Sequence, residues 1–271
     1  MNALIEQAQK AHVPYGEAKV WWLSQMGLLI KLGKTLLCVD YYASDDPART
    51  VPPPIPVGEV TGIDVFLGTH DHSDHIDHPS WAVWAKTCPD ARFVFPAAHA
   101  KAVLADGVKP QNCFGLNDGQ SVRLGNVTIR ALAAAHEFLD RDEQSGLYPC
   151  LQYVIEGNGV RLYHAGDTLR YEGMLPKLCG FGPIDLALLP INGRDAERYR
   201  RNCIGNMTFQ EAADLAGELQ PGAVMPGHWD LFANNSADPT QFRDYLEAKY
   251  GQSPRCVVPK LGEEIGIPIA D

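Results

Sequence analysis

Short apolar runs that end at a small residue or a turn recur along the chain and predict most of its strands. Residues 20–40 read as a β-meander with turns near Gly27 and Gly33. Four later runs also read as strands. They cover residues 63–68, 127–132, 160–164 and 223–225.

Helical signals become frequent after the first strands and dominate the connections of the second half. Thr208 and Glu211 have the spacing of a capping box, so a helix is predicted to begin there and to run to about Leu219, before Pro221 and Gly222. Further helices are predicted at residues 79–86, 97–105 and 239–250, and a closing strand at 256–259.

Length and composition predict one globular domain over residues 1–271. Hydrophobic residues make up 45% and charged residues 21% of the chain, which are ordinary values, and a chain of this length can bury a large core. The net charge of -10 disfavours a nucleic-acid partner. No apolar run of about 18 residues occurs, so no membrane association is expected, and the start lacks the basic region of a signal peptide.

The seven cysteines are scattered and never spaced as CxxC. This pattern disfavours a disulfide framework and predicts a cytoplasmic location. The sequence leaves open whether the protein forms a homo-oligomer.

The densest polar motif is His70-Asp71-His72-Ser73-Asp74-His75, which follows the predicted strand at 63–68. Imidazole and carboxylate groups are the ligands that divalent metals such as Zn²⁺ prefer. A ligand cluster at the end of a strand predicts a metal site at the edge of a sheet, where a substrate has access.

Each later predicted strand is also followed closely by a histidine or an aspartate. His136 follows the strand at 127–132, Asp167 follows the strand at 160–164, and His228 follows the strand at 223–225. The repetition of this arrangement predicts that these side chains complete the metal site.

The order HxHxDH, lone His, GDT and GH resembles the metallo-β-lactamase superfamily over about residues 20–260. The resemblance implies an α/β fold, a four-layer αββα sandwich, with two metal ions at one edge of the sheets. It further implies three ligands for the first metal, three for the second and one bridging carboxylate. These are His70, His72 and His136 for the first, Asp74, His75 and His228 for the second, and Asp167 as the bridge.

Within that superfamily the chain is most similar to the L-ascorbate-6-phosphate lactonase family. The similar segments include residues 20–23, 69–77, 206–208 and 228–232. The loop between Asp40 and Asp64 is shorter than in those lactonases, so the resemblance carries the metal chemistry further than it carries the substrate.

The implied cofactors are two divalent metal ions, Zn²⁺ or Mn²⁺. A metal-bound hydroxide would open a small lactone, such as a phosphorylated sugar lactone, with Asp74 or Asp167 orienting the water. The acid that protonates the leaving group is unassigned. Two alternatives stay open: a metal-dependent phosphodiesterase, and a non-enzymatic metal-binding scaffold.

Several other polar residues are candidates to orient ligands or to contact the substrate. They are Asp40, His164, Asp230 and Asn234. Arg194 begins an arginine cluster that extends to Arg201, and its guanidinium group suits an anionic small-molecule substrate. The alternative is a solvated loop in which Asp195 and Glu197 pair with these arginines.

Overall fold

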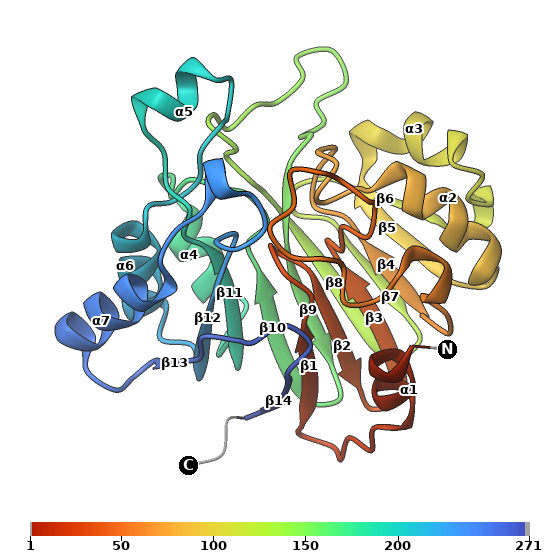
Figure 1. Ribbon diagram of the computed structural model, residues 1–271, viewed down its shortest axis with the longest axis horizontal. Coiled ribbons are helices and arrows are strands. Elements are labelled where there is room, and N and C mark those ends of the chain that lie inside the picture. The colour runs from red at the N-terminus through yellow and green to blue at the C-terminus, as the bar shows by residue number, and fades with distance from the viewer. Residues whose placement is uncertain (1, 269–271) are drawn as a thin grey trace.

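The computed structural model describes residues 2–268 and contains two seven-stranded mixed sheets that face each other (Figure 1). The first sheet has the order β14 (Glu264–Ile267), β1 (Ala18–Trp22), β2 (Leu28–Leu32), β3 (Thr35–Val39), β4 (Val65–Leu67), β5 (Arg92–Pro96) and β6 (Cys113–Leu116). The second has the order β13 (Arg255–Cys256), β12 (Ala223–Gly227), β11 (Leu186–Pro190), β10 (Val160–His164), β9 (Leu151–Gly157), β8 (Val127–Ala133) and β7 (Ser121–Leu124).

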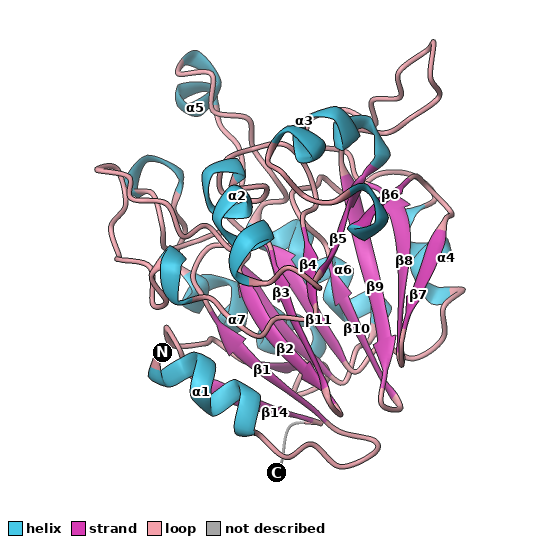
Figure 2. Ribbon diagram, turned by 90° about the vertical axis from the view of Figure 1, so that its right-hand side faces the viewer, coloured by secondary structure: helices cyan, strands magenta, loops and turns pink. Residues whose placement is uncertain are grey.

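Helices cover the outer face of each sheet (Figure 1). The first sheet is covered by α1 (Ala3–Lys10), α2 (His78–Thr87) and α3 (Ala100–Ala105). The second is covered by α4 (Met174–Cys179), α6 (Phe209–Leu219) and α7 (Pro239–Tyr250). The short helix α5 (Ala196–Arg200) rises beyond the upper ends of the strands (Figure 2).

Three buried apolar clusters fill the spaces between these four layers. The central cluster joins the two sheets through residues such as Leu37 and Ile129. The outer clusters pack Trp81 and Trp84 of α2 against the first sheet, and Phe242 and Leu246 of α7 against the second. The predicted αββα sandwich is therefore the observed fold.

Strand direction brings the predicted ligand loops to one edge of the sandwich. The pairs β3–β4, β10–β11 and β11–β12 are parallel. Strands β8 and β10 also run in the same direction, because each is antiparallel to β9. The loops that follow β4, β8, β10 and β12 consequently leave from the carboxyl ends of strands, where ligand sites of α/β sheets commonly form.

The closing strand predicted at 256–259 is wrong in extent, because the observed strand β13 covers only Arg255–Cys256. Only Arg255–Cys256 pairs with β12 in the second sheet. The last strand of the described residues, β14, instead pairs with β1 in the first sheet. The helix predicted at 97–105 is divided into a 3₁₀ turn at Ala97–His99 and α3. The predicted meander and the helices at 79–86 and 239–250 are confirmed.

The predicted capping box at the start of α6 is also confirmed. The Thr208 hydroxyl accepts a hydrogen bond from the Glu211 amide at 3.3 Å, and the Thr208 amide donates to the Glu211 carboxylate at 2.9 Å. We expect Thr208→Ala to lower the free energy of unfolding by about 1 kcal/mol, because amide groups at the helix start lose their acceptor. Urea unfolding of the variant measures this loss. Thr208→Ser keeps the hydroxyl and serves as the control; equal stability of the two variants would contradict the prediction.

Among residues 2–268, no helix has the length and apolar character needed to cross a membrane.

Candidate metal centre

The loop after β4 carries the HxHxDH motif and is held tightly against the sheet. Gly68 is needed here, since a Cβ atom at this position would lie 2.3 Å from Cγ1 of Ile76. Gly166, which precedes Asp167, has a φ of +57°, and a Cβ atom there would lie 2.8 Å from Cβ of Thr69. The two glycines allow the β4 and β10 loops to approach each other closely.

Three histidines form the first cluster of the candidate metal centre. Nδ1 of His72 lies 2.9 Å from Nε2 of His70 and 3.2 Å from Nε2 of His136. One nitrogen from each of these three residues falls within 4.8 Å of the other two, which is close enough for a single metal ion to contact all of them.

The second cluster consists of Asp74, His75 and His228. Oδ2 of Asp74 lies 3.6 Å from Nε2 of His75 and 3.6 Å from Nε2 of His228. These residues come from the β4 loop and from the end of β12, which belong to different sheets. The second cluster therefore spans the two sheets.

Asp167 lies between the two clusters. Its Oδ1 is 3.3 Å from Nε2 of His75, and its Oδ2 is 3.1 Å from Nε2 of His228 and 3.8 Å from Nε2 of His136. A single carboxylate thus approaches members of both clusters, which is the arrangement expected of a group that bridges two metal ions.

Buried polar atoms without partners show that the centre suits a cation. Nε2 of His75 and Oδ1 of Asp167 are buried and face each other at 3.3 Å, but neither makes a hydrogen bond among the described residues. A buried polar atom left unpaired costs about 1–3 kcal/mol. A divalent ion between such atoms satisfies their lone pairs, and the nitrogen and carboxylate donors suit zinc as well as manganese.

Comparison with known proteins identifies the family of this chain. A model of the beta-lactamase superfamily domain matches residues 38–229. The chain belongs to the β-lactamase superfamily.

Curated relatives within the superfamily include the probable L-ascorbate-6-phosphate lactonase UlaG of Salmonella paratyphi B. It is 28% identical over 288 residues, which cover 92% of this chain and 79% of the relative. The protein of the same name from Salmonella newport matches to the same extent.

Solved structures share the fold. The metallo hydrolase Igni18 from Ignicoccus hospitalis has a TM-score of 0.73 at 20% identity, covering 94% of this chain and 100% of that one. An isothiocyanate hydrolase from Delia radicum gut bacteria has a TM-score of 0.71 at 18% identity, covering 91% of this chain and 98% of that one. At these identities the likeness establishes the metallo-β-lactamase fold.

The histidines of the two clusters differ in the direction in which their pKa values are shifted. Burial lowers the pKa of His136 to about 4 and holds the pKa of His70 well below its usual range. Burial acts the same way on His75 and His228, but nearby carboxylates, Asp167 foremost, outweigh it and raise the pKa of both residues. His70 and His136 of the first cluster are therefore neutral at pH 7, whereas the second cluster retains protons more readily.

The two carboxylates respond in the opposite sense to burial. Burial by itself raises the pKa of Asp167, but His228 and His75 outweigh it and bring the pKa well below the usual range. Burial also raises the pKa of Asp74, but His75 and His228 outweigh it and lower that pKa as well. Both groups are carboxylates at neutral pH, the form that coordinates metals.

Asp40, which follows β3, contacts a predicted ligand directly. Its Oδ2 accepts hydrogen bonds from Nδ1 of His75 at 2.7 Å and from the Thr69 hydroxyl at 2.6 Å, and its Oδ1 accepts from the Thr69 amide at 2.8 Å. A proton fixed on Nδ1 of His75 leaves Nε2 free to face Asp167.

The other polar candidates have different surroundings. Nε2 of His164 donates to the Met26 carbonyl at 2.8 Å, so this buried histidine holds the β1–β2 turn. Oδ1 of Asp230 accepts from the Gln25 amide at 2.8 Å. Asn234 is exposed, and it is the neighbouring Asn235 that contacts Asn192.

The arginine cluster is engaged by partners within the chain. Both branches of the Arg194 guanidinium group bind the Glu211 carboxylate, and one branch also donates to the Asn206 carbonyl at 3.1 Å. Arg198 pairs with Asp195, while Arg200 and Arg201 pair with Glu197. The ion pairs of Arg198, Arg200 and Arg201 are those of the solvated-loop alternative. The guanidinium group of Arg194 is instead engaged by Glu211.

Two residues that contact the candidate metal centre were not predicted from the sequence. Thr69 links Asp40 to the motif, and Nε2 of Gln25 donates to Oδ2 of Asp74 at 2.7 Å. The threonine stands directly beside His70, which was a local signal. Gln25 lies 49 residues from Asp74 in a turn of its own, and no sequence pattern connects them.

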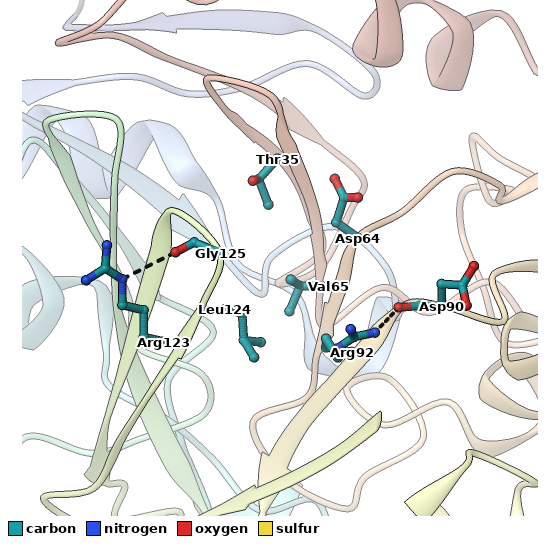
Figure 3. Close-up of a pocket in the computed structure, with 8 residues that line it drawn as sticks. All are labelled: Thr35, Asp64, Val65, Asp90, Arg92, Arg123, Leu124 and Gly125. Atoms are coloured by element: carbon teal, nitrogen blue, oxygen red, sulfur yellow. Dashed lines mark hydrogen bonds between the residues drawn. The ribbon is translucent and has the colours of Figure 1, made fainter. Parts of the chain in front are cut away.

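A cavity of about 420 Å³ lies at the opposite edge of the sandwich (Figure 3). It is lined by Thr35, Val65 and Arg92, the first residues of β3, β4 and β5, and by the β7–β8 turn. The HxHxDH motif follows the other end of β4, so this cavity is separate from the candidate metal centre.

Proposed function

We propose that this protein is a metal-dependent hydrolase that opens a small lactone. The observation that carries the proposal is the convergence of histidine and aspartate side chains at one sheet edge, with buried atoms of His75 and Asp167 that make no hydrogen bond among the described residues. The similarity to L-ascorbate-6-phosphate lactonases over 92% of the chain supports a lactone as the substrate class.

In this proposal the first cluster would hold one metal ion and the second cluster would hold another, and Asp167, which faces both clusters, would serve them with its charge. The first cluster is His70, His72 and His136, and the second is Asp74, His75 and His228. When bound, such ions lower the pKa of water to about 7 and polarise the carbonyl group that is attacked.

The chain's own residues orient the reaction. The Asp167 side chain is 4% exposed and holds the two clusters together from within. The Asp74 side chain is 14% exposed, so it is the more accessible of the two carboxylates and would orient a water molecule by accepting a hydrogen bond. Asp40 keeps the proton of His75 on Nδ1.

The test combines metal analysis with two kinds of substrate. The protein is purified without chelator, its metals are quantified by mass spectrometry, and the same sample is assayed on a lactone panel and on bis(p-nitrophenyl) phosphate. We expect about two metal ions per chain and turnover of a lactone. Turnover of the phosphodiester alone would replace the lactonase with a phosphodiesterase. No metal binding and no activity after addition of Zn²⁺ or Mn²⁺ would overturn the proposal.

The two clusters should lose metal at different pH values. His136 has a pKa of about 4 and His70 a pKa well below its usual range, so protons do not compete for these two ligands of the first cluster near pH 6. The raised pKa values of His75 and His228 mean that protons compete there at higher pH. Calorimetric titration of metal-free protein at about pH 8, 7 and 6 should show that metal binding at the second cluster weakens before binding at the first cluster as the pH falls. Parallel weakening of both steps would contradict this assignment.

A further inference from the structure

We propose that Gln25 is a positioning residue that sets the metal affinity of the second cluster, the one formed by Asp74, His75 and His228. This inference rests on the proposed function, because it concerns the same metal centre. Gln25 lies in the turn between β1 and β2, which is separate from the HxHxDH loop. This turn brings a neutral amide to the centre rather than a side chain of the type that binds metal.

The Gln25 side chain touches two members of the second cluster. Its Nε2 donates to Oδ2 of Asp74 at 2.7 Å and lies 3.0 Å from Nε2 of His228. Gln25 is 1% exposed, and its Oε1 is buried without a hydrogen-bond partner in residues 2–268. A buried amide with one unpaired oxygen is costly to retain in a purely structural turn.

The backbone of Gln25 contacts His228 and Asp230. Its carbonyl accepts a hydrogen bond from the His228 amide at 2.7 Å, and its amide donates to Oδ1 of Asp230 at 2.8 Å. Gln25 therefore joins the loop after β12 to the loop after β4, and its position relative to His228 is set by two separate contacts.

Three residues at and around Gln25 have strained backbone conformations, which the surrounding packing must maintain. Ser24, Gln25 and His228 have φ values of 80°, 57° and 58°, in the left-handed region that residues other than glycine rarely occupy. Such conformations cost free energy and persist where surrounding contacts over-determine them. The hydrogen bond between His228 and Gln25 joins two of these strained residues directly.

The chemistry of the amide indicates how it acts. The lone pair on Nε2 of His228 serves either a metal ion or a hydrogen bond from Gln25, but not both. The hydrogen bond to Asp74 is compatible with metal binding, since a carboxylate oxygen has more than one lone pair. Gln25 thus restrains the orientation of the Asp74 carboxylate when His228 coordinates, and its side-chain hydrogen bonds within residues 2–268 go to the second cluster.

The experiment uses Gln25→Met, which keeps the length of the side chain and the backbone contacts but removes the N–H donor. Metal-free wild type and variant are titrated calorimetrically with Zn²⁺ and separately with Mn²⁺, and metals per chain are counted after dialysis. We expect the binding step of the first cluster to be unchanged. The binding step of the second cluster should weaken about 10- to 100-fold, the range typical when a group that orients a ligand is lost. Gln7→Met makes the same replacement at an exposed glutamine on α1 and should change neither step.

The outcomes separate this inference from the proposed function. Two unchanged binding steps in Gln25→Met, with two metals bound by wild type, would overturn the role of Gln25 and leave the metal centre intact. Equal weakening of both steps, with a lower melting temperature of the metal-free variant, would mean that Gln25 only supports the fold and would also overturn the inference. A wild type that binds no metal would instead overturn the proposed function.

Discussion

Asp167→Asn should abolish hydrolysis and reduce the bound metal to less than about one ion per chain. The substitution keeps the shape of the side chain but removes the charge that faces both clusters, at 3.3 Å from His75 and 3.1 Å from His228. Loss of a group that merely orients a ligand costs about 10- to 100-fold in affinity or activity. Loss of the group between the clusters should therefore reduce activity by more than ~100-fold.

Mass spectrometry of bound metals and the lactone assay together measure this effect. Circular dichroism shows whether the variant is folded. Asp214→Asn removes a carboxylate of α6 that pairs with Lys249 of α7 on the outer surface, and this control should retain both metals and activity. An Asp167→Asn protein that keeps wild-type turnover would refute the two-metal centre.

Asp40→Ala should be the most destabilising of the single changes near the centre. Asp40 is 1% exposed and accepts three hydrogen bonds, two from Thr69 and one from His75. Removing one partner of a buried charged network leaves the other donors unpaired and costs about 3–5 kcal/mol. Urea unfolding of the metal-free protein measures this loss directly.

Asp40→Asn separates the stability effect from the metal effect. An asparagine amide in place of Oδ2 donates to Nδ1 of His75, which moves the histidine proton to Nε2, the atom that faces Asp167. We expect a smaller loss of stability than in Asp40→Ala but a metal affinity weakened about 10- to 100-fold. Asp64→Asn, at an exposed aspartate that precedes β4 at the opposite edge, is the matched control. Wild-type affinity in Asp40→Asn would show that Asp40 does not determine the proton position on His75.

Local patterns in the sequence were sufficient to place the candidate ligands. The HxHxDH motif, His136, Asp167 and His228 each follow a recognisable apolar strand, and parallel strands carry the residues after them to the same sheet edge. The capping box at Thr208 was equally readable, because its two partners are three residues apart.

Contacts between distant segments could not be read in this way. The two-residue strand β13 and the return of β14 to the first sheet depend on edge pairing, which hydrophobic pattern alone does not specify. Arg194 has the chemistry of an anion site, yet Glu211, which also caps α6, occupies its guanidinium group.

The sequence by itself determined which side chains are available to bind metal and at which strand ends they stand, since these depend on residue type and short-range periodicity. Only the tertiary structure decided which groups orient them. Asp40 meets His75 across 35 residues and Gln25 meets His228 across 203. Such pairings arise when two sheets pack face to face, and their physical cause is the burial of polar groups that must then find partners in space.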